Sequence, residues 1–264
     1  GAGVGGAPPP PPASRPGAPG STAGIQLAIE EKLVVTLSRD GGLQGMEVKG
    51  DLQLLITDAA VGKCTLPLIM GDNAGFQFKT HPNINKALFT QRPSTLALRD
   101  PSRAFPTGSA LGVLKWRLQS NDEANVPLVI NCWPTQTSDD TFELTVEYEL
   151  NEKFELREVR VCIPIAAGAP SGLQAAAGEA TYDKRTSSLI WCIPIVDSSN
   201  ASGTVEFTAQ STTGADGFFP IDVSFTSPKI FCELEVSEVK SADDQSPLPF
   251  GKQAGMSVES YQVV

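Results

Sequence analysis

The stretch that decides the fold is TFELTVEYEL, residues 141–150, in which apolar and polar side chains alternate without a break. Phe142, Leu144, Val146 and Tyr148 share one parity, and threonine and glutamate occupy the other. Successive side chains of a β-strand point to opposite faces, so this pattern buries one face and leaves the other in water. Such a strand is typical of an antiparallel sheet that packs on a core with one side.

The same alternation recurs on both sides of this stretch. It is found at residues 33–37, 46–56, 159–165, 189–195, 219–225 and 230–236. The first two of these segments are joined by RDGG, residues 39–42, a hairpin turn in which glycine accepts positive φ. Helical periodicity is almost absent. The sequence therefore predicts an all-β fold of antiparallel β-sandwiches, and the roughly 240 residues of strand pattern predict two packed units.

The first 23 residues differ from the rest of the chain. Gly, Ala and Pro dominate there, with five consecutive prolines at residues 8–12. Such a segment buries too little apolar surface to offset the entropy of ordering, so residues 1–23 are predicted to be a disordered linker. No secretory signal is visible, and we expect the folded module to follow a further N-terminal part of a longer protein.

Charge and motif content exclude several classes of function. The chain has 20 basic and 30 acidic residues, a net charge of −10, which argues against nucleic acid as a partner. His81 is the single histidine, so neither a two-histidine metal site nor a histidine relay can form within the chain. Nucleophile-elbow and phosphate-loop motifs are missing. We expect no catalytic residues, no metal and no cofactor.

The cysteines and tryptophans have structural explanations. The five cysteines are widely spaced and contain no C-x-x-C pair: Cys64, Cys132, Cys162, Cys192 and Cys232. They are predicted to be reduced, buried thiols of a cytosolic protein, acting as small hydrophobic side chains. Trp116, Trp133 and Trp191 lie on strand patterns and are predicted core residues rather than ligand platforms.

Charge is unevenly distributed along the chain. Residues 63–117 carry eight basic and two acidic side chains, a net of +6, whereas residues 118–264 carry eight basic and 22 acidic, a net of −14. A basic stretch in an acidic protein favours an acidic peptide or an anionic membrane surface as a partner. The alternative is that these charges are scattered over both sheet faces and only solvate them.

One segment within this basic stretch is a candidate binding site. Residues 75–86, GFQFKTHPNINK, combine two aromatic side chains at period two with a turn, and two lysines flank that turn. One interpretation is a strand that ends in a proline turn and buries its phenylalanines; the other is an aromatic and cationic groove for an extended peptide. The predicted peptide-binding residues are Phe76, Phe78, Lys79, His81, Pro82, Ile84 and Lys86, with Lys115 and Arg117 within reach on a neighbouring strand.

A set of short motifs carries a family resemblance. In order, they are IEEK at 29–32, RDGGLQ at 39–44, THPN at 80–83, GVLKWR at 112–117, NCWP at 131–134, EYEL at 147–150 and FFP at 218–220. Together they resemble the C-terminal mu-homology domain of the delta subunit of coatomer, the COPI vesicle coat. The resemblance covers about residues 24–264. It implies two interlocked antiparallel β-sandwich subdomains, one inserted in the other: subdomain A at 24–126 and 228–264, and subdomain B at 127–227.

The same resemblance implies a function. It implies a non-catalytic adaptor module of the COPI coat, acting in retrograde Golgi-to-ER and intra-Golgi transport, with other coatomer subunits as partners. It implies binding of short tryptophan-based motifs in disordered segments of ER tethers and Arf GTPase-activating proteins. The implied location is cytoplasmic, peripheral on Golgi membranes and COPI-coated vesicles. The alternative is a coat domain that contacts an anionic membrane or a phosphoinositide through the basic stretch.

The resemblance also implies that one binding site of related proteins is lost. Clathrin-adaptor mu subunits bind tyrosine-based signals with an aromatic and an acidic residue on the first strand and a Trp-x-Arg pair on a late strand. Here the first-strand positions correspond to Gln26 and Ala28, and the late strand, residues 256–261, has neither Trp nor Arg. Tryptophan motifs are therefore expected at a different place on subdomain A.

Overall fold

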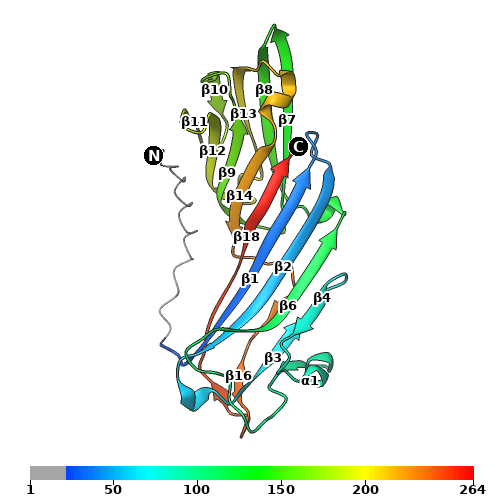
Figure 1. Cartoon of the computed structure of the whole chain (residues 1–264), viewed down its shortest axis with the longest axis vertical. Coiled ribbons are helices and arrows are strands. Elements are labelled where there is room, and N and C mark those ends of the chain that lie inside the picture. Colours follow the sequence, from blue (N-terminus) through cyan, green and yellow to red (C-terminus); the bar gives the residue numbers. More distant parts are fainter. Residues whose placement is uncertain (1–21) are drawn as a thin grey trace, which may run out of the picture.

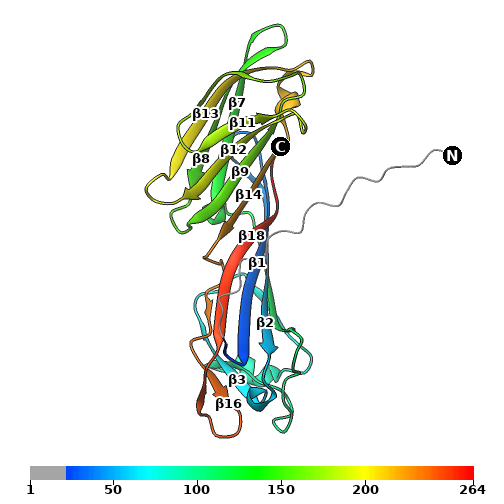
Figure 2. The ribbon, with the colours of Figure 1, turned by 90° about the vertical axis from the view of Figure 1, so that its left-hand side faces the viewer.

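The computed structural model describes residues 22–264, so the predicted linker over residues 1–23 lies almost entirely outside the described residues. The described part is elongated and consists almost entirely of strands, with smaller sheets packed on a long central one (Figure 1, Figure 2). Among the helices of this part, not one is long and apolar enough to cross a membrane. The prediction of an all-β fold is confirmed.

The elements follow one another along the chain with few helical interruptions. The strands are β1 (Ile25–Leu37), β2 (Leu43–Ile56), β3 (Cys64–Met70), β4 (Gln77–Thr80), β5 (Ser94–Leu96), β6 (Leu111–Ser120), β7 (Leu128–Ser138), β8 (Thr141–Leu150), β9 (Leu156–Pro164), β10 (Ser171–Ala175), β11 (Glu179–Asp183), β12 (Ser188–Val196), β13 (Ser202–Gln210), β14 (Ile221–Ser227), β15 (Leu234–Glu235), β16 (Val239–Ser241), β17 (Pro247–Leu248) and β18 (Gly251–Val263). The helical segments are α1 (Lys86–Thr90), η1 (Ala59–Val61), η2 (Glu123–Asn125) and η3 (Gly214–Phe218).

Three sheets organise these strands. The central sheet has nine strands in the order β11-β12-β9-β14-β18-β1-β2-β6-β4. A four-stranded sheet, β10-β13-β8-β7, and a sheet of β15-β3-β16-β17, with β5 paired to β3, complete the fold. Among the strand pairs that the structure describes, β1 and β18 run parallel and the others are antiparallel, so the prediction of antiparallel sheets holds with that one exception.

Two hydrophobic cores lie along the central sheet, and β1 contributes to both. Ile25, Leu27 and Ile29 pack in the core beneath β3, whereas Leu33 and Leu37 pack in the core between the central and four-stranded sheets. The two cores are therefore joined by continuous strands rather than by a flexible linker (Figure 2). The division into subdomains A and B at the predicted boundaries stays a prediction.

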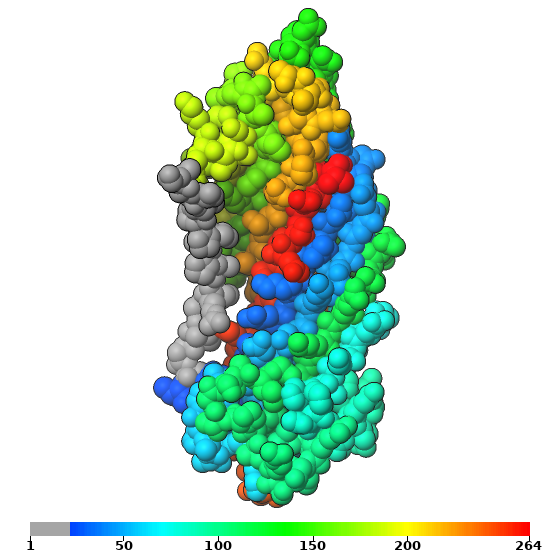
Figure 3. Space-filling model, viewed as in Figure 1, coloured from blue at the N-terminus to red at the C-terminus, as the bar shows by residue number. Residues whose placement is uncertain are grey.

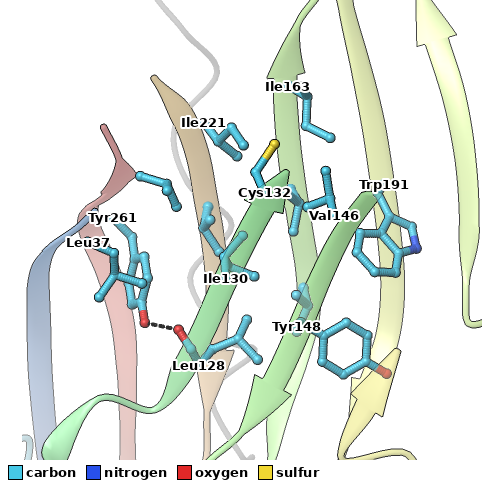
Figure 4. Close-up of a cluster of buried hydrophobic side chains, with 14 of the residues drawn as sticks. Leu37, Leu128, Ile130, Cys132, Val146, Tyr148, Ile163, Trp191, Ile221 and Tyr261 are labelled. Atoms are coloured by element: carbon cyan, nitrogen blue, oxygen red, sulfur yellow. Dashed lines mark hydrogen bonds between the residues drawn. The ribbon is translucent and has the colours of Figure 1, made fainter. Parts of the chain in front are cut away.

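The core between the central and four-stranded sheets contains the inward-facing side chains of residues 141–150. Tyr148 and Trp191 are fully buried, and their ring centroids lie 5.4 Å apart (Figure 4). The Trp191 Nε1–H donates a hydrogen bond of 2.7 Å to the carbonyl of Ala177. In the same core the hydroxyl of Tyr261 donates to the carbonyl of Leu128. The polar hydrogens of Trp191 and Tyr261 are therefore hydrogen-bonded although both side chains are buried.

Strand parity corrects part of the cysteine prediction. Cys64, Cys132 and Cys232 are buried, but Cys192 is exposed and Cys162 is half-buried. Cys192 follows the inward-facing Trp191 and therefore points out of the sheet. The prediction of buried cysteines rests on their lying in strands. Burial depends on whether the position faces the core or the solvent.

Two further positions are exposed against expectation. Trp133 follows the buried Cys132 on β7, so it points away from the core and is 46% exposed. Ile195 is 48% exposed, because Val196 takes the inward position at the end of β12. On the paired strand β9, Glu158 lies between the residues that are opposite Ile193 and Ile195. Its φ of 52° is a left-handed conformation, which interrupts the regular alternation of side chains there.

Candidate functional site

The predicted site lies at one edge of the central sheet. The short strand β4 forms this edge, as Figure 1 shows, and within residues 22–264 it pairs with β6 alone. In the β4–β6 register Phe78 is opposite Trp116, and Lys79 is opposite Lys115. Arg117 is opposite the residue before Phe78. The structure thus brings Lys115 and Arg117 next to β4, as the sequence analysis expected.

The sheet divides the predicted site residues between its two faces. Phe78 lies on the core face together with the buried Trp116. Lys79, Lys115 and Arg117 have the opposite parity, and all three are exposed on the outer face. Because neighbouring residues of a strand point in opposite directions, the aromatic and cationic side chains cannot line one groove on a single face. The expected groove is corrected to two surfaces that meet at the edge strand.

The aromatic surface is a cluster of four rings at this edge. Phe78 lies 6.2 Å from Phe76, 5.9 Å from Phe89 and 6.5 Å from Trp116, measured between ring centroids. Trp116 is buried, whereas the three phenylalanines are half-buried. The cluster therefore packs on the core and still offers apolar area to a partner.

Phe89 was missed by the sequence analysis. It is placed by α1, which begins after Asn85: the Asn85 side chain accepts hydrogen bonds from the backbone N–H groups of Ala87 and Leu88. An asparagine in this position is a strong helix start signal, and it could have revealed the helical turn. Lys86, one of the predicted site residues, is the first residue of α1 and is exposed.

The turn after β4 holds the remaining predicted residues. The backbone N–H of Asn83 donates to Nδ1 of His81 at 3.1 Å, so the histidine closes a turn. Pro82 is exposed. Ile84 is 1% exposed and belongs to the core, so it cannot contact a peptide and is corrected to a structural residue. Its backbone N–H donates to the carbonyl of His81 at 2.9 Å.

The outer face beside β4 carries a cationic row. Lys32, Lys49 and Arg117 are directly opposite one another on β1, β2 and β6. These strands run side by side on the face seen in Figure 3. Like charges in such positions repel, but here the row is partly compensated: Arg117 pairs with Glu47, and Lys49 Nζ lies 4.0 Å from Glu259.

The basic stretch of the sequence is therefore dispersed rather than gathered in one patch. Lys79, Lys115 and Arg117 are on the outer face of the central sheet, whereas Arg99 and Arg103 lie in the loop between β5 and β6. Lys63 Nζ lies 3.8 Å from Asp243 and is partly neutralised there. Of the two interpretations of this stretch, these positions favour scattered charges over one continuous patch.

Residues 11–263 match the family of adaptor complexes medium subunits, and the chain belongs to that family. It is similar to coatomer subunit delta-1 of Oryza sativa subsp. japonica, at 39% identity over 243 residues, which is 91% of this chain and 46% of that protein. The chain thus spans about half the length of these curated coatomer delta relatives.

Two solved structures extend the comparison. The yeast delta-COP-I mu-homology domain superposes with a TM-score of 0.79 and 28% identity, covering 94% of this chain and 100% of that chain. The yeast delta-COP-I mu-homology domain complexed with a Dsl1 WxWxV peptide gives 0.78 and 29%, covering 91% and 98%. The predicted resemblance to the delta-coatomer mu-homology domain is confirmed.

Proposed function

We propose that this chain is the mu-homology module of a COPI delta subunit and a non-catalytic adaptor that binds short tryptophan-based motifs. The observation that carries this proposal is the similar yeast domain complexed with a WxWxV peptide, at 29% identity. The proposed partners are other coatomer subunits, ER tethers and Arf GTPase-activating proteins. The proposed location is cytoplasmic, peripheral on Golgi membranes and COPI-coated vesicles.

The proposed peptide site is the edge of the sheet at β4. Phe76 and Phe78 offer apolar contact on one face, and Lys86 and Pro82 are exposed nearby on the helix and the turn. A peptide that lies along the free edge of β4 can reach both faces of the strand. Lys79, Lys115 and Arg117 would then attract acidic residues that flank the motif. His81 would hold the shape of the turn between β4 and α1.

The affinity of such a peptide is expected to be modest. A short disordered segment loses conformational entropy when it binds, so a micromolar dissociation constant is expected, about −7 to −9 kcal/mol. Calorimetric titration with an acidic Trp-x-Trp peptide tests this. Lys79→Glu with Lys86→Glu should weaken binding and flatten its salt dependence, with an unchanged melting curve, because both side chains are exposed.

A matched control makes this test specific. Lys184→Glu with Arg185→Glu introduces the same charge change in the turn between β11 and β12, and both side chains are exposed there. This control should leave the affinity near that of the unmodified chain. Equal affinity and equal salt slope in the Lys79 and Lys86 variant would place the peptide elsewhere. Absence of binding to the unmodified chain would overturn the proposed function.

A second candidate function is contact with an anionic membrane, and the cationic row of Lys32, Lys49 and Arg117 favours it. An outer sheet face with aligned cations suits a negatively charged surface. Co-sedimentation with phosphatidylserine vesicles, compared with neutral vesicles, distinguishes the candidates. Membrane contact would be supported by salt-sensitive vesicle binding that is lost in Lys32→Glu with Lys49→Glu. The unmodified chain would then also show no affinity for the Trp-x-Trp peptide.

A further inference from the structure

We infer that a cavity beside the turn at residues 81–84 is the anchor pocket for an apolar side chain of an acidic peptide, with Arg99 and Arg103 binding that peptide's carboxylates. The cavity has a volume of about 410 Å³ and lies between the loop after β5 and the start of β6. The inference rests on the proposed function, because it assigns a subsite for the same class of partner. None of the residues predicted from the sequence lines this cavity.

The cavity has apolar walls that are held in place before any ligand arrives. Leu98 and Leu111 line it and pack with their other sides against the core beneath β3. The Arg99 N–H donates to the carbonyl of Asn83 at 2.9 Å, which ties the loop to the turn after β4. The far end of the loop is anchored by Phe105, which is 3% exposed. A preformed pocket saves a ligand the cost of ordering it.

The charges around the cavity select an acidic partner. Arg99 and Arg103 are exposed, and in the described part of the chain neither forms an ion pair within 4.0 Å. Asp100 accepts hydrogen bonds from the N–H and hydroxyl of Ser102 at 3.0 and 2.6 Å, and these bonds, together with the positive charge of Arg103 nearby, lower its pKa. Its carboxylate is thus engaged within the loop, and the lining keeps one net positive charge.

Apolar walls and guanidinium groups together define the ligand. An aliphatic or aromatic side chain fills the space between Leu98 and Leu111, and a carboxylate on a neighbouring residue reaches Arg99 or Arg103. The ring cluster around Phe78 differs from this pocket because its rings already pack on one another and offer only surface. Most affinity of an aromatic motif comes from enclosing its rings, which favours the cavity as the anchor.

The test separates charge from volume. Arg99→Glu with Arg103→Glu reverses the guanidinium charges, and Ala104→Trp fills the cavity without changing charge, because Ala104 lines it and is exposed. Calorimetry with an acidic WxWxV peptide should show at least tenfold weaker binding for both variants. Only the arginine variant should also lose salt dependence. Lys184→Glu with Arg185→Glu is the charge-matched control. Thermal melts verify that each variant folds. Ala104→Leu fills less of the cavity and replaces Ala104→Trp if that variant does not fold.

The outcomes are distinguishable. If the unmodified chain binds the peptide and both cavity variants bind it equally well, the anchor pocket is wrong and the proposed function stands. If the unmodified chain does not bind the peptide, both fall. If the arginine variant loses binding to phosphatidylserine vesicles but keeps its peptide affinity, the two arginines serve a lipid surface, which overturns the inference.

Discussion

The Nε1–H of Trp116 donates a hydrogen bond of 2.8 Å to Oε1 of Glu31, a carboxylate that is fully buried in the central sheet. Glu31 occupies the β1 position between the residues of the two cores, and its carboxylate also accepts from the backbone N–H groups of Phe231 and Cys232. Three donors from distant parts of the chain therefore converge on one buried carboxyl group. This arrangement joins β1, β6 and the segment before β15 where the two cores meet.

The first prediction concerns the pH dependence of stability. Burial raises the pKa of Glu31 above its ordinary value of 4.5, although the three hydrogen bonds oppose that shift. A raised pKa means that the folded state holds the proton more tightly than the unfolded state. The contribution of Glu31 to stability is therefore fully present below about pH 4.5 and is lost as the pH rises through the folded-state pKa.

This dependence can be isolated by comparing two proteins. Glu31→Gln cannot ionise, so the difference in unfolding free energy between the unmodified chain and this variant should change as the pH rises above about 4.5. Denaturant melts across that range measure it. Asp40 and Asp100 have lowered pKa values and act below this window, and they are the same in both proteins. Parallel stability curves would show that Glu31 does not titrate with folding.

The second prediction concerns the close packing of Trp116 on β2. Gly50 lies opposite Trp116, and a Cβ atom added there would come within 1.9 Å of the indole ring. Gly50→Ala should destabilise the fold by about 1–3 kcal/mol, because the ring must move from its hydrogen bond with Glu31. Gly45→Ala is the matched control on the same strand, since nothing lies within 4 Å of its added Cβ.

Denaturant melts of both alanine variants decide this prediction. The control should stay within about 0.5 kcal/mol of the unmodified chain. If Gly50→Ala behaved like Gly45→Ala, the indole would have room to shift, and the contact between Glu31 and Trp116 would not depend on the missing side chain at Gly50.

The third prediction concerns the core between the central and four-stranded sheets. Trp191→Ala should cost about 3–5 kcal/mol in unfolding free energy, because it removes a fully buried ring and leaves the carbonyl of Ala177 without its donor. Trp133→Ala removes a side chain that is 46% exposed and should cost about 1 kcal/mol or less. Equal losses in the two melts would contradict the assignment of Trp191 to the core.

The fourth prediction uses the cysteines as probes of parity. Burial raises the pKa of Cys64, Cys132 and Cys232 to about 12, so these thiols should resist alkylation in the folded protein. Cys192 is exposed and should react first, followed by the half-buried Cys162. Mass spectrometry after timed alkylation counts the modified sites. Early modification of Cys132 would show that the sheet containing β7 opens in the native state.

The fifth prediction concerns tyrosine-based signals. Gln26 and Ala28 lie on β1 with opposite parity to its buried residues, and the family resemblance implies that they stand in place of the aromatic and the acidic side chain of a tyrosine-signal site. A Tyr-x-x-apolar peptide should show no saturable binding there, because extended-peptide recognition needs the ring stack, the hydroxyl acceptor and the apolar pocket together. Micromolar binding in a calorimetric titration would disprove the loss of this site.

Much of the fold could be predicted because strand periodicity is a local property. The alternation around Tyr148 correctly placed Phe142, Leu144 and Val146 on a buried face, and the hairpin turn at Gly41 joins β1 and β2 as expected. The candidate site was predicted less well. Its strand and turn were found, but Phe89 was missed, because only the three-dimensional path of α1 brings it over Phe78.

By itself, the sequence determined the all-β class, the inward face of the major strands and the resemblance to delta-coatomer domains, because alternation and short motifs can be read from neighbouring residues. Tertiary structure alone decided that Phe78 lies beside Phe89 and Trp116 at an edge strand, and that Glu31 meets Trp116 and Cys232. It also decided where the cavity beside Arg99 lies. Such contacts depend on the register between strands far apart in the chain, and residue type and spacing do not specify that register.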